Sequence, residues 1–318
     1  MGGIGIVSNP RAAGRRRDPA SAGRLARLLG SDGLALEAST PDELRRAVEA
    51  MVAARIDTLA VDGGDGTAHL VLTALAEAWG PGPLPRFLPL CGGTMNVVAA
   101  NHGLTGQPAA VLADHLALRR AGRPQPVVER DLLRVEVDGG RPLLGFVFAT
   151  GAAVAFLERF YAGTPGPLRA WLLGARVAAS LVRRGRLARE LLRRQPLRVT
   201  ADGDEWPDAS WLTVLAGTVP SLGMGLRPFG RCDEQPGFFH AVGVHGTLPS
   251  LLRSLPRLRR GGPWRRRAAV DAVVRELVLE GDGIRATVDG DLYGPAQRVR
   301  ITTGPPIEVC CAGARPAG

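Results

Sequence analysis

The chain has 318 residues, of which 45% are hydrophobic and 22% charged, so it is long enough for two domains and can bury a substantial core. Its formal net charge is +10, and all 40 basic residues are arginine because the sequence contains no lysine. This composition argues against intrinsic disorder, and the lack of lysine excludes a GxxxxGK[ST] phosphate loop and Schiff-base chemistry. Any phosphate would be bound by arginine, by backbone N–H groups or through a metal ion.

The four cysteines form no Cys-x-x-Cys pair and no zinc-ligand spacing, so free thiols in a reducing compartment are the simplest interpretation. The first 20 residues lack the apolar core of a signal peptide. No apolar run approaches the roughly 18 residues of a membrane-spanning helix. We therefore expect a cytoplasmic protein.

The first part of the chain alternates strand and helix patterns. Strands are predicted at 4–7, 34–38, 57–61 and 87–90, and helices at 19–30, at 40–55, from the turn after residue 61 to about 79, and after residue 96. The helix at 40–55 opens with Thr40-Pro-Asp-Glu43, a capping box with proline at the first helical position. This alternation predicts an α/β N-terminal domain at 1–125, with a parallel sheet covered on both faces.

The pattern changes after the turn-rich segment 122–126. Short alternating stretches typical of strands occur at 131–137, 143–149, 197–201, 211–216, 238–244, 273–280, 284–288 and 298–302. Their spacing predicts an antiparallel β-sandwich second domain at 126–298. A helical insert interrupts this domain at 167–194.

Two parts of the second domain are strongly basic. The insert at 167–194 has arginines opposite an apolar side, and a second cluster runs from Arg253 to Arg267. Such faces are typical either of solvated helices or of helices that rest on an anionic membrane surface. Nucleic acid is the rival partner for so much arginine. The sequence has no helix-turn-helix, RRM or zinc-finger pattern, so we expect no nucleic-acid partner.

The segment VDGGDGT, residues 61–67, places three glycines and Asp65 in a tight turn between a strand and a helix. Glycine permits positive φ and close approach of a phosphate, and the helix N-terminus attracts anions. Asp65 would repel phosphate unless a cation accompanies it, and Mg²⁺ carried by a nucleotide meets this need. A single turn of this type is more simply explained by a steric requirement of the fold.

A second glycine turn follows the next strand, at Cys91-Gly-Gly-Thr-Met-Asn96. Asn9-Pro10 follows the first strand in the same way. The carboxyl ends of parallel strands share the sheet edge where ligands bind, so we expect these segments to lie together. Two of the three asparagines in the chain, Asn9 and Asn96, fall at these strand ends.

Asn9-Pro10, Gly63-Gly-Asp-Gly-Thr67 and Gly93-Thr-Met-Asn96 resemble the motifs of the diacylglycerol kinase catalytic domain family, which includes bacterial soluble lipid kinases and sphingosine kinases. The resemblance covers nearly the whole chain. It continues through Asp131-Leu-Leu-Arg-Val to Val288-Asp-Gly-Asp291, which resembles the family's late Asp-Gly-Glu motif. The two glycine motifs together are specific, whereas GGDGT alone is shared with NAD kinases.

The resemblance implies an ATP-binding α/β domain, which the last strand at 299–312 could complete, and a β-sandwich lipid-binding domain, with the active site between them. It implies ATP and Mg²⁺ as cofactors, a lipid hydroxyl as acceptor, and a peripheral location at the inner face of an anionic membrane. Asp291 would take the proton of the lipid hydroxyl, and Asp65 would orient the nucleotide or the waters of the metal. The nucleotide-binding residues carried over by the resemblance are Asn9, Thr40, Gly63, Gly64, Asp65, Gly66, Thr67, Gly93, Thr94 and Asn96.

Three positions depart from the family pattern. Asp291 stands in place of the late glutamate, and a shift of about 1 Å in a catalytic group can cost on the order of 10²-fold in rate. Val97 replaces the aspartate that follows GT-x-N. Pro236 replaces the second acid of an Asp-x-x-Asp-Gly-x-Leu segment that holds a structural Mg²⁺ in the family. Asp233, with Glu234 nearby, is therefore expected to form a weak metal site or none.

Two other functions remain open at this point. The chain could be a NAD kinase-like enzyme on a related first domain, although Gly93-Thr-Met-Asn96 and the basic faces favour a lipid acceptor. It could also be a non-catalytic homologue that binds nucleotide or lipid, as the three departures suggest. The sequence identifies neither the lipid, which could be diacylglycerol, a sphingoid base or a related lipid, nor the oligomeric state.

Overall fold

The computed structural model describes residues 2–12, 18–162, 192–223 and 225–312, together with Leu172 and Gly185. The chain divides into two compact units, of which one comprises residues 1–130 and 305–318 and the other residues 131–304. Most of the helical insert predicted at 167–194, with its basic face, lies outside the described residues. No helix in the described part of the chain has the length and apolarity that a membrane crossing requires.

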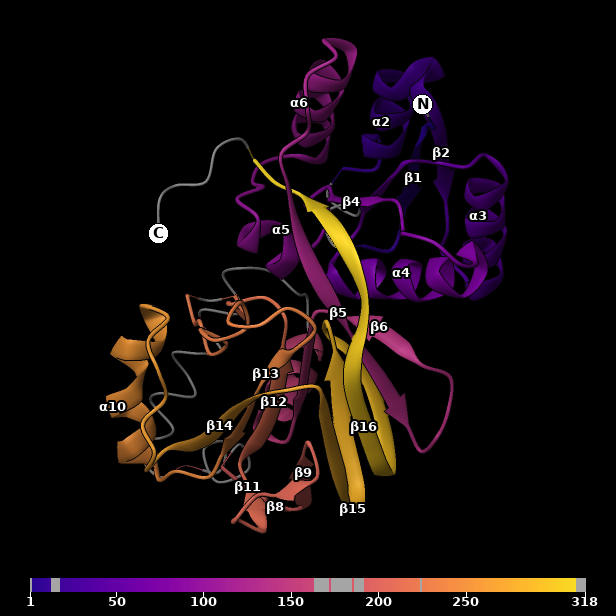
Figure 1. Cartoon of the computed structure of the whole chain (residues 1–318). Helices are drawn as coiled ribbons and strands as arrows, with labels where there is room; N and C mark the ends of the chain where they lie inside the picture. Colours follow the sequence, from indigo (N-terminus) through magenta and orange to yellow (C-terminus); the bar gives the residue numbers. More distant parts are fainter. Residues whose placement is uncertain are drawn as a thin grey trace. The chain divides into compact units, whose positions relative to one another are not determined.

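The first unit is built on a parallel sheet (Figure 1). Its strands are β1 (Ile4–Ser8), β2 (Gly33–Glu37), β3 (Thr58–Asp62) and β4 (Arg86–Pro89), and its helices are α2 (Ser21–Leu29), η1 (Gly30–Asp32, a 3₁₀ turn), α3 (Pro41–Ala53), α4 (Asp65–Trp79), α5 (Val97–Asn101) and α6 (Pro108–Arg120). Strand β1 pairs in parallel with β2 and β3, and β3 pairs in parallel with β4. Val309, near the end of strand β16, pairs in parallel with Phe87 of β4.

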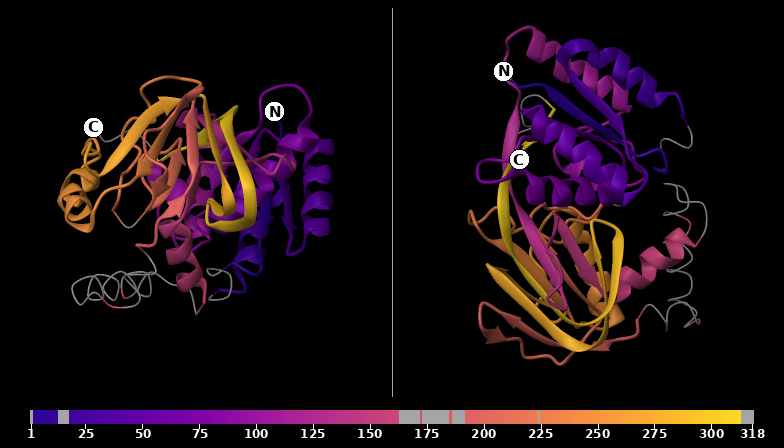
Figure 2. Two further views of the ribbon diagram at one scale, coloured as in Figure 1. Left: turned by 90° about the horizontal axis from the view of Figure 1, so that it is seen from below. Right: turned by 90° about the vertical axis from the view of Figure 1, so that its right-hand side faces the viewer.

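Helices cover both faces of this sheet, as Figure 2 shows. Helix α2 packs beside α6, and α3 packs beside α4. Side chains of β1 alternate between the two layers: Ile4 and Ile6 pack in a core with Leu25 of α2, whereas a side chain at Gly5 would collide with Met51 of α3. The four predicted strands of this unit are found within one residue at each end. Their unbroken apolar runs are typical of strands buried on both faces.

The second unit is antiparallel and rich in β-structure. Its strands are β5 (Val127–Val137), β6 (Leu143–Gly145), β7 (Val147–Thr150), β8 (Gln195–Pro196), β9 (Arg198–Ala201), β10 (Asp204–Glu205), β11 (Ser210–Trp211), β12 (Thr213–Gly217), β13 (Phe239–Val244), β14 (Ala269–Val274), β15 (Glu276–Val288) and β16 (Asp291–Cys310), and its helices are α7 (Ala152–Tyr161) and α10 (Leu248–Arg259). Strands β14, β13, β12, β7, β15 and β16 pair in this order, all antiparallel. The predicted fold class, a parallel α/β domain followed by an antiparallel one, is confirmed.

Several elements of the second unit differ from the sequence prediction, among them helix α10, which was not predicted. Helix α7 was not predicted, because it starts after Gly151 at φ 58° without a side chain that caps it. The strand predicted at 273–280 begins in the last two residues of β14, and the rest of it forms one strand, β15, with the strand predicted at 284–288. The pairing of β15 with β16 shifts register between Glu280 and Ile284. The strand predicted at 298–302 is part of β16, whose internal glycines and prolines do not read as a strand.

Three Asp-Gly turns fix connections in the second unit. Asp138, Asp202 and Asp289 have φ of 47° to 48°, and the glycine after each also has positive φ, the backbone that tight hairpin turns require. The carboxylate of each aspartate accepts hydrogen bonds from two consecutive backbone N–H groups. These donors are Gln297 and Arg298 for Asp138, Arg275 and Glu276 for Asp202, and Phe146 and Val147 for Asp289. The aspartate side chains thus bind the turns to neighbouring strands.

Candidate active site

The carboxyl ends of β1, β3 and β4 lie side by side. The register pairs Ser8 with Asp62 and Val61 with Pro89, so the segments that follow these strands emerge at one edge of the sheet. The N–H group of Asn9 donates to the carbonyl oxygen of Asp62 at 3.0 Å. The sheet therefore brings together the three segments whose motifs the sequence analysis singled out.

Asn9 links the first strand to the start of α4. Its side-chain Nδ2 donates to the hydroxyl of Thr67 at 3.0 Å, and its Oδ1 accepts the N–H of Arg11 at 2.9 Å. Two of the predicted nucleotide-binding side chains are thus in direct contact.

The glycines of the two turns do not use the positive φ that glycine permits. Gly63, Gly64, Gly66, Gly92 and Gly93 all lack positive φ, and Gly64 has φ −86°. Cys91 (φ 59°) and Asn96 (φ 48°) have the left-handed backbone instead. The freedom of glycine to adopt positive φ is therefore not used in these turns, where Cys91 and Asn96 have it.

Close packing explains the glycines. A Cβ on Gly93 would lie 2.4 Å from Cα of Gly64, and a Cβ on Gly92 would lie 2.5 Å from a carboxylate oxygen of Asp62. A Cβ on Gly63 would lie 2.5 Å from Cβ of Thr67. Gly64 differs from these three, because its own Cβ would meet only Cα of Gly93, at an ordinary 3.5 Å. Gly92 and Gly93 are required by contact between the two turns, Gly63 is required by contact with Thr67 of its own segment, and Gly64 has an open side.

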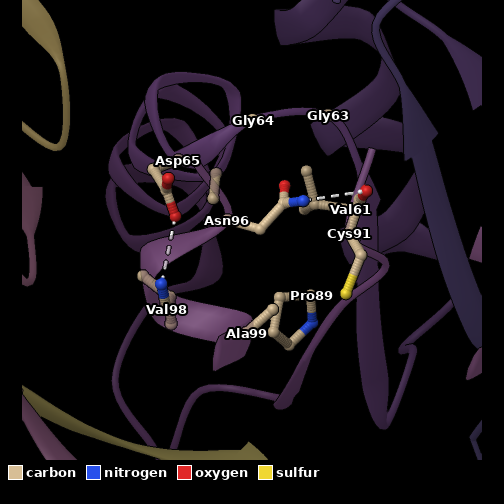
Figure 3. Close-up of a pocket in the computed structure, with 10 residues that line it drawn as sticks. Val61, Gly63, Gly64, Asp65, Pro89, Cys91, Asn96, Val98 and Ala99 are labelled. Atoms are coloured by element: carbon tan, nitrogen blue, oxygen red, sulfur yellow. Dashed lines mark hydrogen bonds between the residues drawn. The ribbon is translucent and has the colours of Figure 1, made fainter. Parts of the chain in front are cut away.

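Asp65 joins the two turns (Figure 3). It is the first residue of α4, and its two carboxylate oxygens accept the N–H groups of Val97 at 2.9 Å and Val98 at 3.1 Å. These N–H groups open helix α5, where no preceding residue can satisfy them. Burial raises the pKa of the Asp65 carboxyl, while these N–H groups act in the opposite direction. The structure gives Asp65 a positioning role that the sequence analysis did not foresee, and its role toward a metal stays a prediction.

Asn96 closes the second turn on itself. Its Oδ1 accepts the N–H of Gly93 at 2.8 Å, and its Nδ2 donates to the carbonyl oxygens of Cys91 at 3.1 Å and Gly93 at 3.3 Å. The side-chain amide of asparagine provides both the acceptor and the donor that these three bonds require. Asn96 therefore shapes the backbone that presents Thr94.

A small cavity lies where the two turns meet. Its volume is about 10 Å³, room for about one water molecule, so a nucleotide would lie on the outer surface of the turns. The cavity is lined by Val61, Gly63, Gly64, Asp65, Ala68, Pro89, Cys91, Asn96, Val98 and Ala99. Cys91 was missed as a candidate, although its place directly before the glycine pair pointed to it.

Thr40 and Thr94 do not line this cavity. Thr40 is exposed and caps α3, since its hydroxyl accepts the N–H of Glu43 at 3.3 Å and the carboxylate of Glu43 accepts the N–H of Thr40 at 3.2 Å. The capping box predicted from the sequence is confirmed. Thr94 is partly exposed in the second turn.

Asp291, the predicted proton acceptor, is the first residue of β16 and directly follows the Asp289-Gly290 turn. It is half-buried, and burial raises the pKa of its carboxyl above the ordinary 3.8. The hydroxyl of Tyr161 donates to the carbonyl oxygen of Gly290 at 3.2 Å. The sequence analysis did not predict that Asp289 and Tyr161 contribute to the turn that precedes Asp291. Asp289 could have been found from its Asp-Gly turn, whereas Tyr161 lies on the unpredicted helix α7.

Arginine provides the positive charge in the segment where the family carries a structural cation. Arg231 donates to both carboxylate oxygens of Glu234 at 2.9 and 3.0 Å and to Asp271 at 3.1 Å. His240 Nε2 lies 3.0 Å from the same oxygen of Asp271. The Arg231 guanidinium lowers the pKa of Glu234, and His240 together with Arg231 lowers that of Asp271.

These residues do not fit a structural Mg²⁺, which requires several oxygen ligands. Pro236 has no side-chain oxygen, Glu234 is held by Arg231, and the carboxylate of Asp131 accepts the N–H of Gly237 at 2.7 Å. Within the described ranges, no group of three or more His, Cys, Asp or Glu residues could hold a metal ion. The weak or absent site at Asp233 stays a prediction.

Solved structures define the class of fold. A putative diacylglycerol kinase from Bacillus anthracis str. Sterne superposes with a TM-score of 0.66 at 16% identity, covering 98% of this chain and 97% of that one. Yeast NADH kinase superposes with a TM-score of 0.50 at 10% identity, covering 98% and 84%. The chain thus has the fold that diacylglycerol kinases and NAD kinases share.

Sequence comparison identifies the family. Residues 4–125 match the model of the diacylglycerol kinase catalytic domain. The chain is also 30% identical over 270 residues to a probable lipid kinase, YegS-like, of Pseudomonas aeruginosa, covering 82% of this chain and 79% of that protein. The chain belongs to the diacylglycerol kinase catalytic domain family, a family of lipid kinases.

Alanine substitutions at Gly93 and Gly64 test which of the two glycines is required by close packing. Gly93→Ala is expected to lower the free energy of unfolding by about 2 kcal/mol or more, because the new Cβ would collide with backbone. Gly64→Ala is expected to change it by less than about 1 kcal/mol, since its φ suits alanine and no atom is too close. Urea denaturation measures both. Equal losses in the two variants would show that the close contact does not decide stability.

Chelation tests the arginine cluster of the second unit. The thermal unfolding midpoint is expected to be the same in EDTA as in Mg²⁺, because Arg231 already neutralises Glu234 and Asp271. Arg231→Met should lower the unfolding free energy by about 1–2 kcal/mol, a value reduced by solvent at this partly exposed pair. Arg298→Met is the control, since Arg298 pairs with Glu280 only at 3.8 Å. A midpoint that rises with Mg²⁺ would contradict this account.

Proposed function

We propose that this protein transfers the γ-phosphoryl group of ATP to the hydroxyl group of a lipid. The observation that carries the proposal is the pair of interlocked glycine turns at the carboxyl ends of β3 and β4, in a chain that belongs to a family of lipid kinases. The turns bring backbone N–H groups and the start of α4 to one edge of the sheet, a setting that favours phosphate. No lysine is needed for this.

The nucleotide would bind on the open side of Gly64. Gly63, Gly64, Gly66 and Gly93 would contribute backbone, and Thr94 and the Asn9–Thr67 pair would contribute polar side chains. ATP would arrive with Mg²⁺ as part of the substrate, and the ion supplies charge neutralisation at the transferred phosphoryl group. Asp65, already engaged with Val97 and Val98, would act mainly by holding the two turns in register.

Asp291 would act as the general base. The lipid O–H bond breaks and its proton passes to the Asp291 carboxylate, while the lipid oxygen forms a bond to the γ-phosphorus and the bond to the ADP oxygen breaks. Burial raises the pKa of Asp291, which makes its carboxylate a stronger base than an exposed aspartate. The Asp289-Gly290 turn would fix its backbone.

A lipid acceptor implies that the enzyme works at a membrane surface. We propose a cytoplasmic protein that associates peripherally with the inner face of an anionic membrane. The net charge of +10 supports this association.

The test is transfer of labelled γ-phosphate from ATP and Mg²⁺ to lipids in anionic mixed micelles. The panel contains diacylglycerol, a sphingoid base, ceramide and a phospholipid with a glycerol headgroup, with NAD as the water-soluble acceptor. A labelled lipid is the expected result, and it would name the substrate. Labelled NADP without labelled lipid would replace the proposal by a NAD kinase activity. ATP binding with no labelled product would favour a non-catalytic homologue.

The Gly64→Ala variant tests where the nucleotide binds. Its affinity for ATP and Mg²⁺, measured by titration calorimetry, is expected to fall at least tenfold, because a methyl group would fill the side that the phosphates approach. Unchanged affinity in this stably folded variant would place the nucleotide elsewhere.

The pH dependence of kcat tests Asp291. A protonated carboxyl cannot accept a proton, so kcat should fall as the pH decreases through a pKa above 3.8. Asp291→Asn is expected to reduce kcat by about 10² to 10⁴-fold with little effect on ATP affinity, and Asp291→Glu should retain activity.

Stability distinguishes this catalytic role from a structural one. A carboxyl whose pKa is higher in the folded chain weakens folding as the pH rises above its unfolded pKa, so Asp291→Asn should not destabilise the protein at neutral pH. Asp204→Asn is the matched control, since Asp204 follows Asp202-Gly203 in an equivalent turn but is exposed. Equal losses of activity in the two variants would contradict the role of Asp291.

A further inference from the structure

A surface of exposed arginines covers helix α10 and the segment after it. Residues 246–268 contain seven arginines and neither aspartate nor glutamate. All seven are exposed, and we call them the arginine surface: Arg253, Arg257, Arg259, Arg260, Arg265, Arg266 and Arg267. Figure 1 shows α10 at the periphery of the second unit.

Among the described residues, no arginine of the arginine surface pairs with a carboxylate, whereas many other arginines of the protein do. Elsewhere arginines pair with acids, as in Arg86–Glu308 at 2.8 Å, Arg119–Asp57 at 2.8 Å and Arg134–Glu136 at 2.8 Å. Among the ion pairs between described residues, none includes an arginine of this surface. Its charge is therefore not neutralised within the described chain and is available to an external anion.

The arginines are held on a fixed support. Ser254 and Leu258 on the inner side of α10 are buried, and the carbonyl oxygen of Leu258 accepts the N–H of Arg227 at 3.0 Å. The indole N–H of Trp264 donates to the carbonyl oxygen of Pro228 at 3.0 Å. The helix and the segment after it are thus attached to the same loop.

The outer side of α10 also has an apolar member. Leu252 is 51% exposed and stands next to Arg253 on the helix. A helix that presents leucine among basic residues suits the boundary between lipid headgroups and acyl chains. Surfaces that bind single-stranded nucleic acid stack bases on aromatic rings, and Trp264 is the one aromatic residue in 246–268. The charge and the exposed leucine together favour a lipid surface.

We propose that the arginine surface binds the headgroups of anionic phospholipids and attaches the second unit to a membrane. Guanidinium groups form paired hydrogen bonds with phosphate oxygens and stay charged at every physiological pH. The proposal rests on the proposed function in one respect: a kinase that acts on lipids needs contact with the bilayer that contains them.

The experiment measures sedimentation of the full chain with vesicles of phosphatidylcholine alone or of phosphatidylcholine with phosphatidylglycerol. The test variant carries Arg253→Gln, Arg257→Gln and Arg260→Gln. The control variant loses the same charge from exposed arginines on other elements, by Arg46→Gln, Arg123→Gln and Arg141→Gln. Thermal unfolding of each variant establishes that it is folded.

Wild type and the control variant are expected to bind the vesicles that contain phosphatidylglycerol, and binding should weaken with added salt. The test variant should bind about a hundredfold more weakly, because each basic residue near an anionic surface contributes about fivefold. Equal loss in the test and control variants would overturn the proposal, since net charge alone would then account for binding. Binding to single-stranded RNA that exceeds vesicle binding at equal phosphate concentration would overturn it in favour of nucleic acid.

A second readout separates this proposal from the kinase proposal. On a short-chain lipid dispersed in non-ionic detergent, the test variant should phosphorylate as fast as wild type, and on anionic vesicles it should be slower. Loss of vesicle binding in the test variant would support the arginine surface even where no lipid is phosphorylated. In that case the proposed function fails and the membrane surface stands.

Discussion

The candidate site depends on the partly buried carboxylate of Asp65. Its oxygens satisfy the first two N–H groups of α5, at 2.9 and 3.1 Å, and thereby hold the second glycine turn against the first. Removing a carboxylate from water is costly, which is why burial raises its pKa, and the two N–H bonds offset that cost. The hydrogen bonds of Asp65 bring the two turns together and so allow the close contact between Gly64 and Gly93. Both glycine motifs therefore contribute to the same contact between the turns.

The same interaction recurs in the second unit, at Asp138, Asp202 and Asp289. Each carboxylate accepts two consecutive N–H groups of a neighbouring strand, so a short side chain satisfies backbone donors that the sheet leaves unpaired. Asp289 therefore resembles two other turn residues of this protein. The turn at Asp289-Gly290 differs from the others in the residue that follows it. Asp291 is half-buried, whereas Asp204, which follows the Asp202-Gly203 turn, is exposed.

The strands of the first unit and its helices α2, α3 and α4 could be predicted from the sequence because each has a local pattern, such as the capping box at Thr40. The single helix predicted after residue 96 is two helices, α5 and α6. The sheet edge that collects Asn9 and Gly63 followed from strand order alone. The partners of Asp65 could not be predicted, since they lie 32 and 33 residues further along the chain. The positive φ of Cys91 and helix α7 have no local signature, and Arg231 meets Asp271, 40 residues further along the chain, only in the folded protein.

Because most of the turn glycines are required for packing, their presence in a sequence indicates common ancestry and does not by itself indicate activity. Gly63, Gly92 and Gly93 are required by close contacts within and between the two turns, so a descendant that lost phosphoryl transfer would have to retain them in order to fold. Gly64 is under no such requirement, because a methyl group fits there. In a descendant that no longer needs phosphoryl transfer, Gly64 is the turn glycine that would be substituted first, while Gly63, Gly92 and Gly93 would be retained.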